Sequence, residues 1–223
     1  MPGEESGAMG NVVLLTPTNQ VQELQTILLD RKTDHSDFVF YADRLMRLVV
    51  EEALNQLPVT QVTVTTPTYC KYKGLEFARG NCGVSLCRSG EAMEIALRQC
   101  ARSIRIAKIL IGEEQKVLYA RFTSDMSTRR VLLLYPILST GQTVLKAISA
   151  LKDNNVSEEN IYLVTLFAHP SSVVRISHRY PLVTIVASKT SKAVPLNFAM
   201  KYFGTEKVMG GYSATFFFLF LLF

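Results

Sequence analysis

A group of hydroxyl side chains around one glycine is the feature of this sequence with the clearest chemical use. In "VLLLYPILSTGQTVLKAI" (131–148), an apolar run is followed by Ser139, Thr140, Gly141 and Thr143, and then by an amphipathic segment. Glycine lets the backbone turn tightly and lets a ligand approach closely. The free N–H groups at the start of a helix, with hydroxyls beside them, can bind a phosphate. The spacing therefore predicts a phosphate-binding loop, with an ordinary capped turn as the alternative, since Ser and Thr also favour helix starts.

The segments around this loop alternate between strand-like and helical hydrophobic spacing. Most of the predicted strands are apolar almost throughout, which is typical of strands covered on both faces. The pattern predicts an α/β fold, a mostly parallel sheet flanked by helices, which binds ligands beyond the carboxyl ends of its strands. Strands are predicted at 62–67, 82–88, 107–112, 117–122, 131–136, 161–167 and 182–188, and helices at 37–57, 90–100, 143–152 and 171–179.

The composition is that of a globular protein with an anionic partner. The chain has 223 residues, of which 48% are hydrophobic and 19% charged, with a formal net charge of +5. These values permit a phosphate ester, a nucleic acid or a membrane surface as the partner. The basic residues are scattered, without a polybasic run or the aromatic–basic motif of an RNA-binding sheet. We therefore do not expect a nucleic-acid partner.

The cysteines indicate free thiols rather than a metal site. Cys70, Cys82, Cys87 and Cys100 include no CxxC pair, and the three histidines are not at metal-ligand spacing from them. Buried thiols in a reducing compartment are the expected state. No metal-ligating residues are assigned.

Both ends of the chain are expected to lie outside the folded domain. Residues 1–18 start with a polar, glycine-rich stretch and are predicted to be a flexible leader, and 19–206 are predicted to form the domain. The tail, 207–223, ends in "ATFFFLFLLF", which is shorter than the ~20 residues of a membrane-spanning helix. Three interpretations of this tail remain open: a membrane-surface anchor, a strand that pairs, or a segment foreign to the fold. No membrane span is expected.

Five segments, in order, resemble the uracil phosphoribosyltransferase family. "YPILSTGQT" is similar to the family's phosphoribosyl-diphosphate loop, whose usual form is Asp-Pro-Met-Leu-Ala-Thr-Gly-Gly-Ser. "ELQTILLDRKTDHSDFVFYADRLMRLVVEEAL" resembles its N-terminal helices, and "VTTPT", "GVSLCRSGEAME" and "YFGTE" resemble further landmarks. The resemblance covers about 20–206 and is strongest to animal members of the family. It implies the type I phosphoribosyltransferase fold.

The resemblance implies a pentosyltransferase that makes UMP and pyrophosphate from uracil and phosphoribosyl diphosphate, usually with Mg²⁺. Arg88 would face the pyrophosphate; its alternative is a surface ion pair with Glu91 or Glu94. Uracil would be bound by Leu196, Asn197 and Phe198. Phosphoribosyl diphosphate would be bound by Arg88, Tyr135, Pro136, Ile137, Leu138, Ser139, Thr140, Gly141, Gln142, Thr143 and Asn197.

The resemblance also implies regulation, assembly and location. Some family members are activated by GTP at a separate site, and members form dimers or tetramers. The cytoplasm is the expected location, with the nucleus as a second one. The GTP contacts would fall at Arg44, Ala78, Arg79, Gly80, Asn81, Arg105 and Arg129.

Three departures from the family pattern leave two hypotheses open. Tyr135 replaces the Asp before the loop proline, Glu113 falls where an arginine is common, and "LNFAMKY" (196–202) replaces the glycine-containing uracil loop, with Asn197 at its first Asp. The five ordered motifs favour a working uracil phosphoribosyltransferase of pyrimidine salvage. The departures favour a catalytically weak or inactive homologue that binds nucleotides or a partner in a regulatory role.

Overall fold

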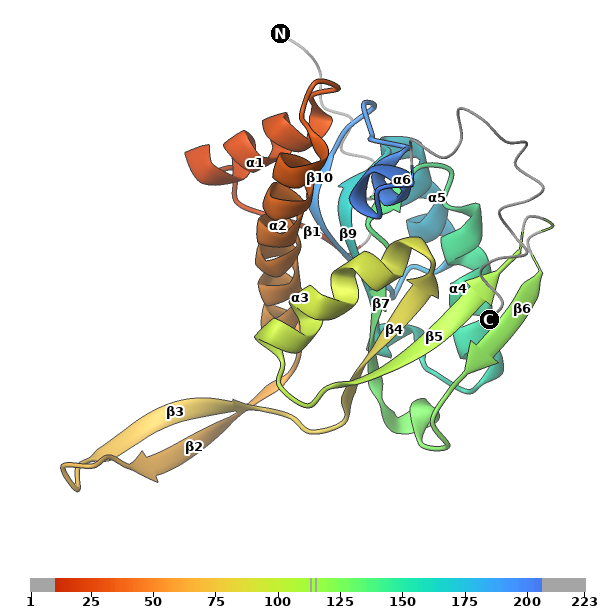
Figure 1. Ribbon diagram of the computed structural model, residues 1–223. Coiled ribbons are helices and arrows are strands. Elements are labelled where there is room, and N and C mark those ends of the chain that lie inside the picture. Colours follow the sequence, from red (N-terminus) through yellow and green to blue (C-terminus); the bar gives the residue numbers. More distant parts are fainter. Residues whose placement is uncertain (1–10, 113, 115, 206–223) are drawn as a thin grey trace, which may run out of the picture.

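The computed structural model of the chain describes residues 11–112, 114 and 116–205 (Figure 1). Its central sheet has the strand order β1-β10-β9-β7-β4-β5-β6, and a short strand, β8, pairs with β9. Neighbouring strands are parallel except at one edge, where β6 is antiparallel to β5. This confirms the predicted mostly parallel sheet. The strands are β1 (Val12–Leu14), β4 (Asn81–Cys87), β5 (Arg105–Ile111), β6 (Val117–Arg121), β7 (Arg130–Leu134), β8 (Ile137–Leu138), β9 (Ile161–Ala168) and β10 (Thr184–Thr190).

Helices cover both faces of this sheet, as Figure 1 shows. One layer contains α1 (Asn19–Leu29), α2 (His35–Asn55) and α3 (Ala92–Cys100). The other layer contains α4 (Gln142–Asp153) and α5 (Pro170–Arg179). The predicted helices therefore lie in both layers, which is the arrangement that parallel sheets require.

Alternate residues of β7 face the two helix layers. Leu132 and Leu134 belong to the buried cluster that includes α2 and α3, whereas Val131 and Leu133 belong to the cluster that includes α4 and α5. All four side chains are fully buried. Successive side chains of a strand point to opposite faces. A strand covered on both sides must therefore be apolar at every position, which explains the continuous run "VLLL" in the sequence.

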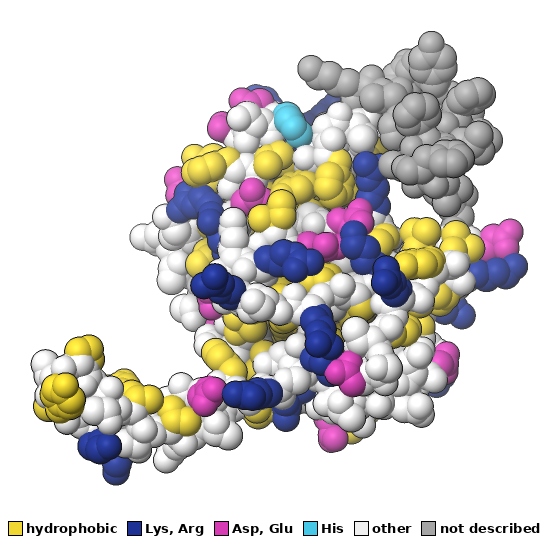
Figure 2. Space-filling model, turned by 60° about the horizontal axis from the view of Figure 1, so that its bottom comes forward, with side chains coloured by type: hydrophobic (Ala, Val, Ile, Leu, Met, Phe, Trp, Pro, Cys, Tyr) yellow, Lys and Arg dark blue, Asp and Glu magenta, His cyan; other side chains and the backbone are white. Residues whose placement is uncertain are grey.

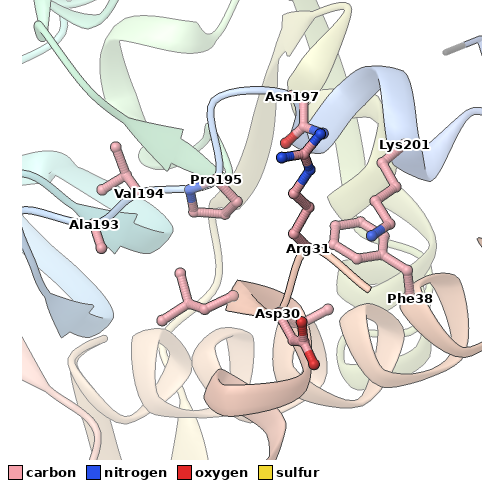
Figure 3. A pocket seen from close by; sticks show the side chains of 10 residues that line it. Asp30, Arg31, Phe38, Ala193, Val194, Pro195, Asn197 and Lys201 are labelled. Atoms are coloured by element: carbon pink, nitrogen blue, oxygen red, sulfur yellow. The ribbon is translucent and has the colours of Figure 1, made fainter. Parts of the chain in front are cut away.

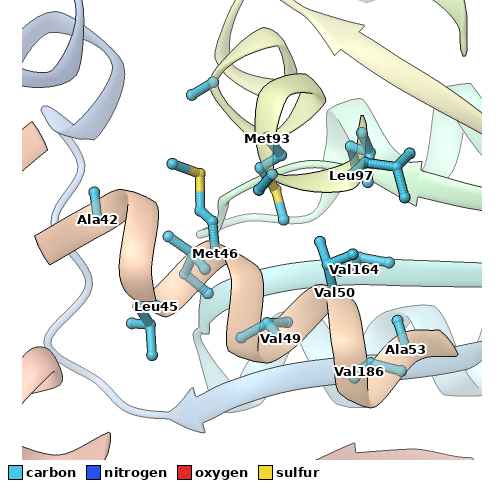
Figure 4. Packing of buried hydrophobic residues seen from close by; sticks show 14 of the residues in the cluster. Ala42, Leu45, Met46, Val49, Val50, Ala53, Met93, Leu97, Val164 and Val186 are labelled. Atoms are coloured by element: carbon cyan, nitrogen blue, oxygen red, sulfur yellow. The ribbon is translucent and has the colours of Figure 1, made fainter. Parts of the chain in front are cut away.

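Helix α2 packs lengthwise on one face of the sheet (Figure 4). Its first turn is capped by Asp34, whose Oδ1 accepts a hydrogen bond from the N–H of Asp37 at 2.8 Å. Full burial of a Leu, Val or Met side chain contributes roughly 1.5–3 kcal/mol. The apolar face of α2 thus anchors the helix that carries Arg44, one of the predicted GTP contacts. That face has helical spacing and consists of Phe38, Ala42, Leu45, Met46, Val49, Val50, Ala53 and Leu54.

A two-stranded antiparallel hairpin projects from the body of the molecule (Figures 1 and 2). It is formed by β2 (Val59–Thr65) and β3 (Lys71–Phe77). A strand at 62–67 was predicted, but its partner strand was not. Both strands are exposed along most of their length, and Leu75 is 67% exposed. An isolated hairpin is marginally stable in water. Its apolar side chains are not covered by a helix layer, unlike those of the central sheet.

The structure corrects the predicted start of the domain. Residues 12–14 were assigned to the flexible leader, yet they form β1, which pairs in parallel with 185–187 of β10. A run of three apolar-rich residues is too short to show strand spacing, so only the pairing reveals it. The predicted tail, 207–223, lies outside the described residues. Within those residues, no helix has both the length and the apolar character needed to cross a bilayer.

All four cysteines are free thiols, as predicted, but they are not all buried. Cys70 is exposed at the turn of the hairpin. Burial raises the pKa of Cys82 and of Cys87 to about 11, and that of Cys100 to about 12. A raised pKa leaves little of the reactive thiolate near neutral pH.

Iodoacetamide at about pH 8 should therefore modify Cys70 first, because exposure makes it accessible while the other thiols remain protonated. Intact-mass spectrometry of the folded protein should show one adduct at early times. In Cys70→Ser that early adduct should disappear. Equally fast labelling at a second position would contradict the prediction.

Candidate functional site

Four segments that follow parallel strands meet at one edge of the sheet. Arg88 follows β4, residues 135–141 follow β7, His169 follows β9, and residues 191–197 follow β10. These four strands are parallel neighbours, so their carboxyl ends lie at the same edge. The structure thus brings Arg88, the predicted phosphate loop and the Asn197 segment to the edge where such sheets bind ligands.

The predicted phosphate loop has an uncapped helix start. Gly141 precedes α4 with a left-handed φ of 78°, and no side chain caps the helix. The Thr140 hydroxyl accepts only a long hydrogen bond, 3.5 Å, from the N–H of Gln142. A Cβ at position 141 would lie 3.2 Å from Cβ of Ser172 on α5. The conformation and the close contact both require glycine, and the first-turn N–H groups can serve an anion.

The backbone before Gly141 is held by hydrogen bonds to β9 and to the chain that follows it. The carbonyl of Pro136 accepts from the N–H of Leu166 at 2.8 Å and from the hydroxyl of Thr165 at 3.1 Å. The side chains of Ile137 and Leu138 are buried in the core. These two residues, predicted to bind phosphoribosyl diphosphate, can therefore contribute only through their backbone. Ser139 is half-buried and Thr140 is exposed, so neither residue is enclosed in the core.

Tyr135 stands at the entrance of the loop, where it is half-buried. Its ring packs against the cluster between the sheet and the α4–α5 layer. Burial raises the pKa of its hydroxyl, and a hydrogen bond with Thr143 opposes part of that rise. The phenol therefore stays neutral near pH 7. Thr143 is thus already engaged by Tyr135, a contact that the sequence did not reveal.

Arg88 is exposed and lies against the segment after β10. Its guanidinium carbon lies 5.2 Å from the ring centroid of Phe203, within the range of a cation–π contact. The alternative for Arg88, an ion pair with Glu91 or Glu94, is not present. Lys108 takes that place, with its Nζ 2.6 Å from Glu91 Oε1 and 3.3 Å from Glu94 Oε1. Arg88 is therefore available for an anion at the carboxyl edge.

The segment that replaces the family's uracil loop ends in a short helix, α6 (Phe198–Tyr202). Phe198 is 1% exposed, and its ring lies 5.3 Å from that of Phe38 on α2. The hydroxyl of Tyr202 donates to Asp43 Oδ1 at 2.7 Å. Leu196, in contrast, is 73% exposed. The three predicted uracil contacts thus differ: Phe198 faces the core, whereas Leu196 faces solvent and Asn197 lines a pocket.

This pocket, of about 570 Å³, lies between the α1–α2 connection and the segment after β10 (Figure 3). Arg31 reaches toward Asn197 across it. The Nζ of Lys201 lies 4.9 Å from the ring centroid of Phe38 at its wall. Asp30 also lines the pocket, and its Oδ1 accepts from the N–H of Lys32. The pocket therefore combines two cations with an amide and one carboxylate, which suits a polar or anionic ligand.

The predicted GTP residues divide into two places. Residues 78–80 precede β4 and Asn81 begins it, while Arg105 begins β5 and Arg129 lies just before β7. All of them are at the amino edge of the sheet. Asp125 joins the two arginines: it pairs with Arg129, and its Oδ2 lies 3.8 Å from Nη1 of Arg105. The hydrogen bond from Arg129 holds the pKa of Asp125 well below its usual range. A phosphate that binds Arg105 and Arg129 must therefore compete with the Asp125 carboxylate for the two guanidinium groups.

Arg44 does not join that group through any contact in the described part of the chain. It lies on α2, where its guanidinium carbon is 5.9 Å from the ring centroid of Phe40 and 5.8 Å from that of Tyr41. Gly80 has a left-handed φ of 97°, and its carbonyl accepts from the N–H of Arg130 at 3.0 Å. The structure thus brings Arg105 and Arg129 together and leaves Arg44 with aromatic partners on its own helix.

Several residues at the carboxyl edge were not predicted from the sequence. Arg31 and Lys201 line the pocket beside Asn197, and Arg175 of α5 donates to the carbonyl of Thr140 at 3.0 Å. His169 caps α5 through a contact with the N–H of Ser171. Helix-cap preference could have indicated His169, followed as it is by proline. The two arginines carried no local signal, because scattered surface cations look alike in a sequence.

The loop itself supplies hydroxyls but no carboxylate, which bears on Mg²⁺. The ion usually takes one or two carboxylates together with substrate phosphates. Tyr135 occupies the loop position at which the family has Asp, and the described residues contain no group of three or more His, Cys, Asp and Glu side chains that could hold a metal. Glu113, the second departure, lies outside the described residues. The loop thus does not fit a resident Mg²⁺, and we derive no step through one.

An uncapped helix start, an exposed arginine and a polar pocket lie at the carboxyl edge of this sheet, an arrangement that fits a phosphoribosyltransferase of type I fold, a pentosyltransferase class of enzyme. A family model described as uracil phosphoribosyltransferase matches residues 15–199. The chain belongs to the uracil phosphoribosyltransferase family, which confirms the resemblance seen in its motifs.

Individual relatives agree with this assignment. The chain is 50% identical over 204 residues to the uracil phosphoribosyltransferase homolog of Danio rerio, which covers 89% of this chain and 79% of the relative. It is 41% identical over 210 residues to the uracil phosphoribosyltransferase of Dictyostelium discoideum, and this match covers 88% of the chain and 97% of the relative. A solved protein structure from Aquifex aeolicus superposes with a TM-score of 0.72 at 16% identity, and the match covers 86% of this chain and 97% of the other. That structural likeness supports the fold.

Proposed function

We propose that the protein transfers the phosphoribosyl group of phosphoribosyl diphosphate to N1 of uracil, in pyrimidine salvage. The bond from ribose C1 to the diphosphate oxygen breaks, the bond from C1 to N1 forms, and the N1 proton is lost. The products are UMP and pyrophosphate. The observation that carries the proposal is the uncapped helix start at Gly141, at the same sheet edge as Arg88 and Asn197.

In this proposal the 5-phosphate binds the N–H groups at the start of α4. Those groups point out of the helix, and the positive end of its dipole favours an anion. The hydroxyl-bearing residues Ser139 and Thr140 directly precede Gly141, and neither is buried. Residues 136–138 position the loop, because the Pro136 carbonyl accepts hydrogen bonds from β9 and the Leu138 carbonyl accepts one from the N–H of His169. A rigid cradle of this kind binds phosphate without the ordering cost of a mobile loop.

Arg88 would stabilise the leaving pyrophosphate. Guanidinium groups bind phosphoryl oxygens with two parallel hydrogen bonds, and a cation fixed near the leaving group stabilises the charge that develops there. The ring of Phe203 orients this guanidinium from one side. Mg²⁺ would accompany phosphoribosyl diphosphate as part of the substrate, bound to its diphosphate oxygens.

Uracil would lie beside the segment 196–198, with its edge paired to backbone groups. The side chain of Phe198 is buried, which fixes the backbone of this segment against α2. Arg31 and Lys201, in the adjacent pocket, would keep this region positive for an anionic substrate. The base and the sugar phosphate thus approach from β10 and β7, which are separated by β9 and so by roughly 10 Å between strand axes.

Conversion of labelled uracil to UMP by the purified protein tests the proposal. The assay contains phosphoribosyl diphosphate and Mg²⁺, with and without GTP, and product is separated by chromatography. Formation of labelled UMP above the protein-free control is the expected result. Binding of phosphoribosyl diphosphate without any UMP would instead identify the catalytically inactive regulatory homologue.

We also propose that GTP binds near Arg105 and Arg129. The unpaired Nε of Arg129 and the unpaired Oδ1 of Asn81 are buried donor and acceptor atoms close to this group.

GTP should raise the melting temperature by mass action, and Arg105→Ala should lose that shift, because Arg105 is the more exposed of the two arginines. Differential scanning fluorimetry measures the effect. Lys32→Ala, an exposed cation outside this group, should keep it; equal shifts in all three proteins would remove Arg105 from the site.

We propose that the protein is a homo-oligomer in which the hairpin makes intermolecular contacts. Leu75 and Phe77 lie on one face of the hairpin beside Val59, and all three are exposed. Figure 2 shows apolar side chains along this hairpin. Exposed apolar patches of this kind mark interfaces.

Leu75→Lys should therefore reduce the oligomer to monomers at micromolar concentration, because a charge on the apolar face opposes burial. Size-exclusion chromatography with light scattering measures the mass. Gln99→Lys, an exposed change of the same charge on α3, should leave the assembly intact. A monomeric parent protein would contradict the proposal.

A further inference from the structure

A cavity between α4 and α5 adjoins the phosphate loop, with which it shares Gln142 at the start of α4. It has a volume of about 420 Å³ and is lined mostly by charged and polar side chains of α4, of α5 and of Tyr180, which directly follows α5. Figure 1 shows the two helices as neighbours in one layer. This size is within the range of small-molecule sites. Its walls include Lys146, Ser149, Arg175, His178, Arg179 and Tyr180.

The cavity is positively charged and lacks a matching carboxylate. Lys146, Arg175 and Arg179 line it with His178, and no Asp or Glu is among its lining residues. In the part of the chain that the structure describes, none of these four makes an ion pair, whereas the neighbouring Lys152 pairs with Glu158. Cations gathered without a counter-ion repel one another, and a bound anion would relieve that repulsion.

The chemistry of the walls selects the kind of anion. Guanidinium groups match the geometry of phosphoryl oxygens, and the Lys146 ammonium adds a mobile point charge. Tyr180 is buried, with the guanidinium carbon of Arg179 5.8 Å from its ring centroid. Its ring face is therefore already occupied by a cation. The cavity thus suits the phosphate group of a ligand rather than a stacked base.

We propose that this cavity binds a phosphate-bearing small molecule, with Lys146 and Arg179 as the principal cations. Arg175 contributes less freely, because one of its nitrogens donates to the carbonyl of Thr140 at 3.0 Å. A free polyphosphate and a nucleoside polyphosphate share the chemistry that the cavity recognises. The proposal does not depend on the transferase reaction, since Lys146 and Arg179 are not among the residues proposed to bind phosphoribosyl diphosphate or uracil.

Isothermal titration calorimetry of the full chain with inorganic tripolyphosphate, at low ionic strength, tests the site. Lys146→Ala and Arg179→Ala should each weaken the affinity of this site roughly tenfold, the effect of losing one charge-assisted hydrogen bond. Arg175 is left unchanged because its loss would also alter the phosphate loop. Lys73→Ala, on the exposed hairpin, removes the same charge at a distance and should bind tripolyphosphate as the parent does.

A second titration, with ATP, distinguishes the sources of the phosphate. Equal affinity for ATP and tripolyphosphate, lost together in Lys146→Ala, supports a site for the polyphosphate alone. Tighter binding of ATP, again lost in Lys146→Ala, supports a nucleotide. Equal weakening in Lys73→Ala would show a diffuse charge effect and overturn the proposal. Unchanged affinity in both α4–α5 variants, or binding of a short RNA without binding of tripolyphosphate, would overturn it as well.

Discussion

Gly141→Val should abolish binding of phosphoribosyl diphosphate, with no measurable heat in calorimetric titration. A β-branched residue at a φ of 78° is strained, at a cost of about 1–3 kcal/mol. The new Cβ would also lie 3.2 Å from Cβ of Ser172 and 3.6 Å from Cδ1 of Ile176. The start of α4 and the face of α5 would have to separate, which would displace the N–H groups that form the proposed phosphate cradle.

Gly80→Val is the matched control for this substitution. Gly80 also has a left-handed φ, 97°, but the nearest atom to its Cβ position, the carbonyl oxygen of Thr128, is 3.9 Å away. The control therefore introduces similar backbone strain far from the phosphate loop. It should bind phosphoribosyl diphosphate normally. Unaltered binding in a folded Gly141→Val protein would show that this loop is only the start of a helix.

Tyr135→Asp should raise transferase activity by roughly ten- to a hundredfold. The family resemblance implies that a carboxylate at this position accepts ribose hydroxyls. A hydrogen bond to a charged group contributes ~1.5–3 kcal/mol, and each 1.36 kcal/mol of transition-state stabilisation is about tenfold in rate. The present phenol is neutral, since burial raises its pKa, and it engages Thr143. The substitution would supply the charge and release that hydroxyl at the same time.

Tyr135→Phe separates these two effects. It releases Thr143 without adding a charge, so its activity should stay within a few-fold of the parent. Both variants need a melting curve, because Tyr135 packs against the α4–α5 cluster and Asp should lower the melting temperature. Steady-state kcat/KM for phosphoribosyl diphosphate, corrected for the folded fraction, is the measurement. An increase in Tyr135→Phe as large as in Tyr135→Asp would show that the carboxylate is unimportant and that Tyr135 inhibits through Thr143.

Local patterns in the sequence determined much of the fold. Helical spacing predicted α2 and α4 within a few residues of their observed bounds, because each has one apolar face along its length. Continuous apolar runs predicted β7 and β9, because both faces of those strands are covered. The first strand and the partner strand of the hairpin were missed. β1 has only three residues, and β3 is exposed on both faces, so neither shows a burial pattern.

The sequence by itself showed the hydroxyls around Gly141, the order of the family motifs and the replacement at Tyr135. Its residue types predicted a phosphate-binding loop and showed that this loop lacks the carboxylate of the family pattern. Only the tertiary structure decided which side chains share space. In the structure Glu91 and Glu94 form ion pairs with Lys108 rather than with Arg88. Phe198 is buried, and Arg175 of α5 donates a hydrogen bond to the loop. Those outcomes depend on strand order and helix packing between residues far apart in the chain, which local spacing does not encode.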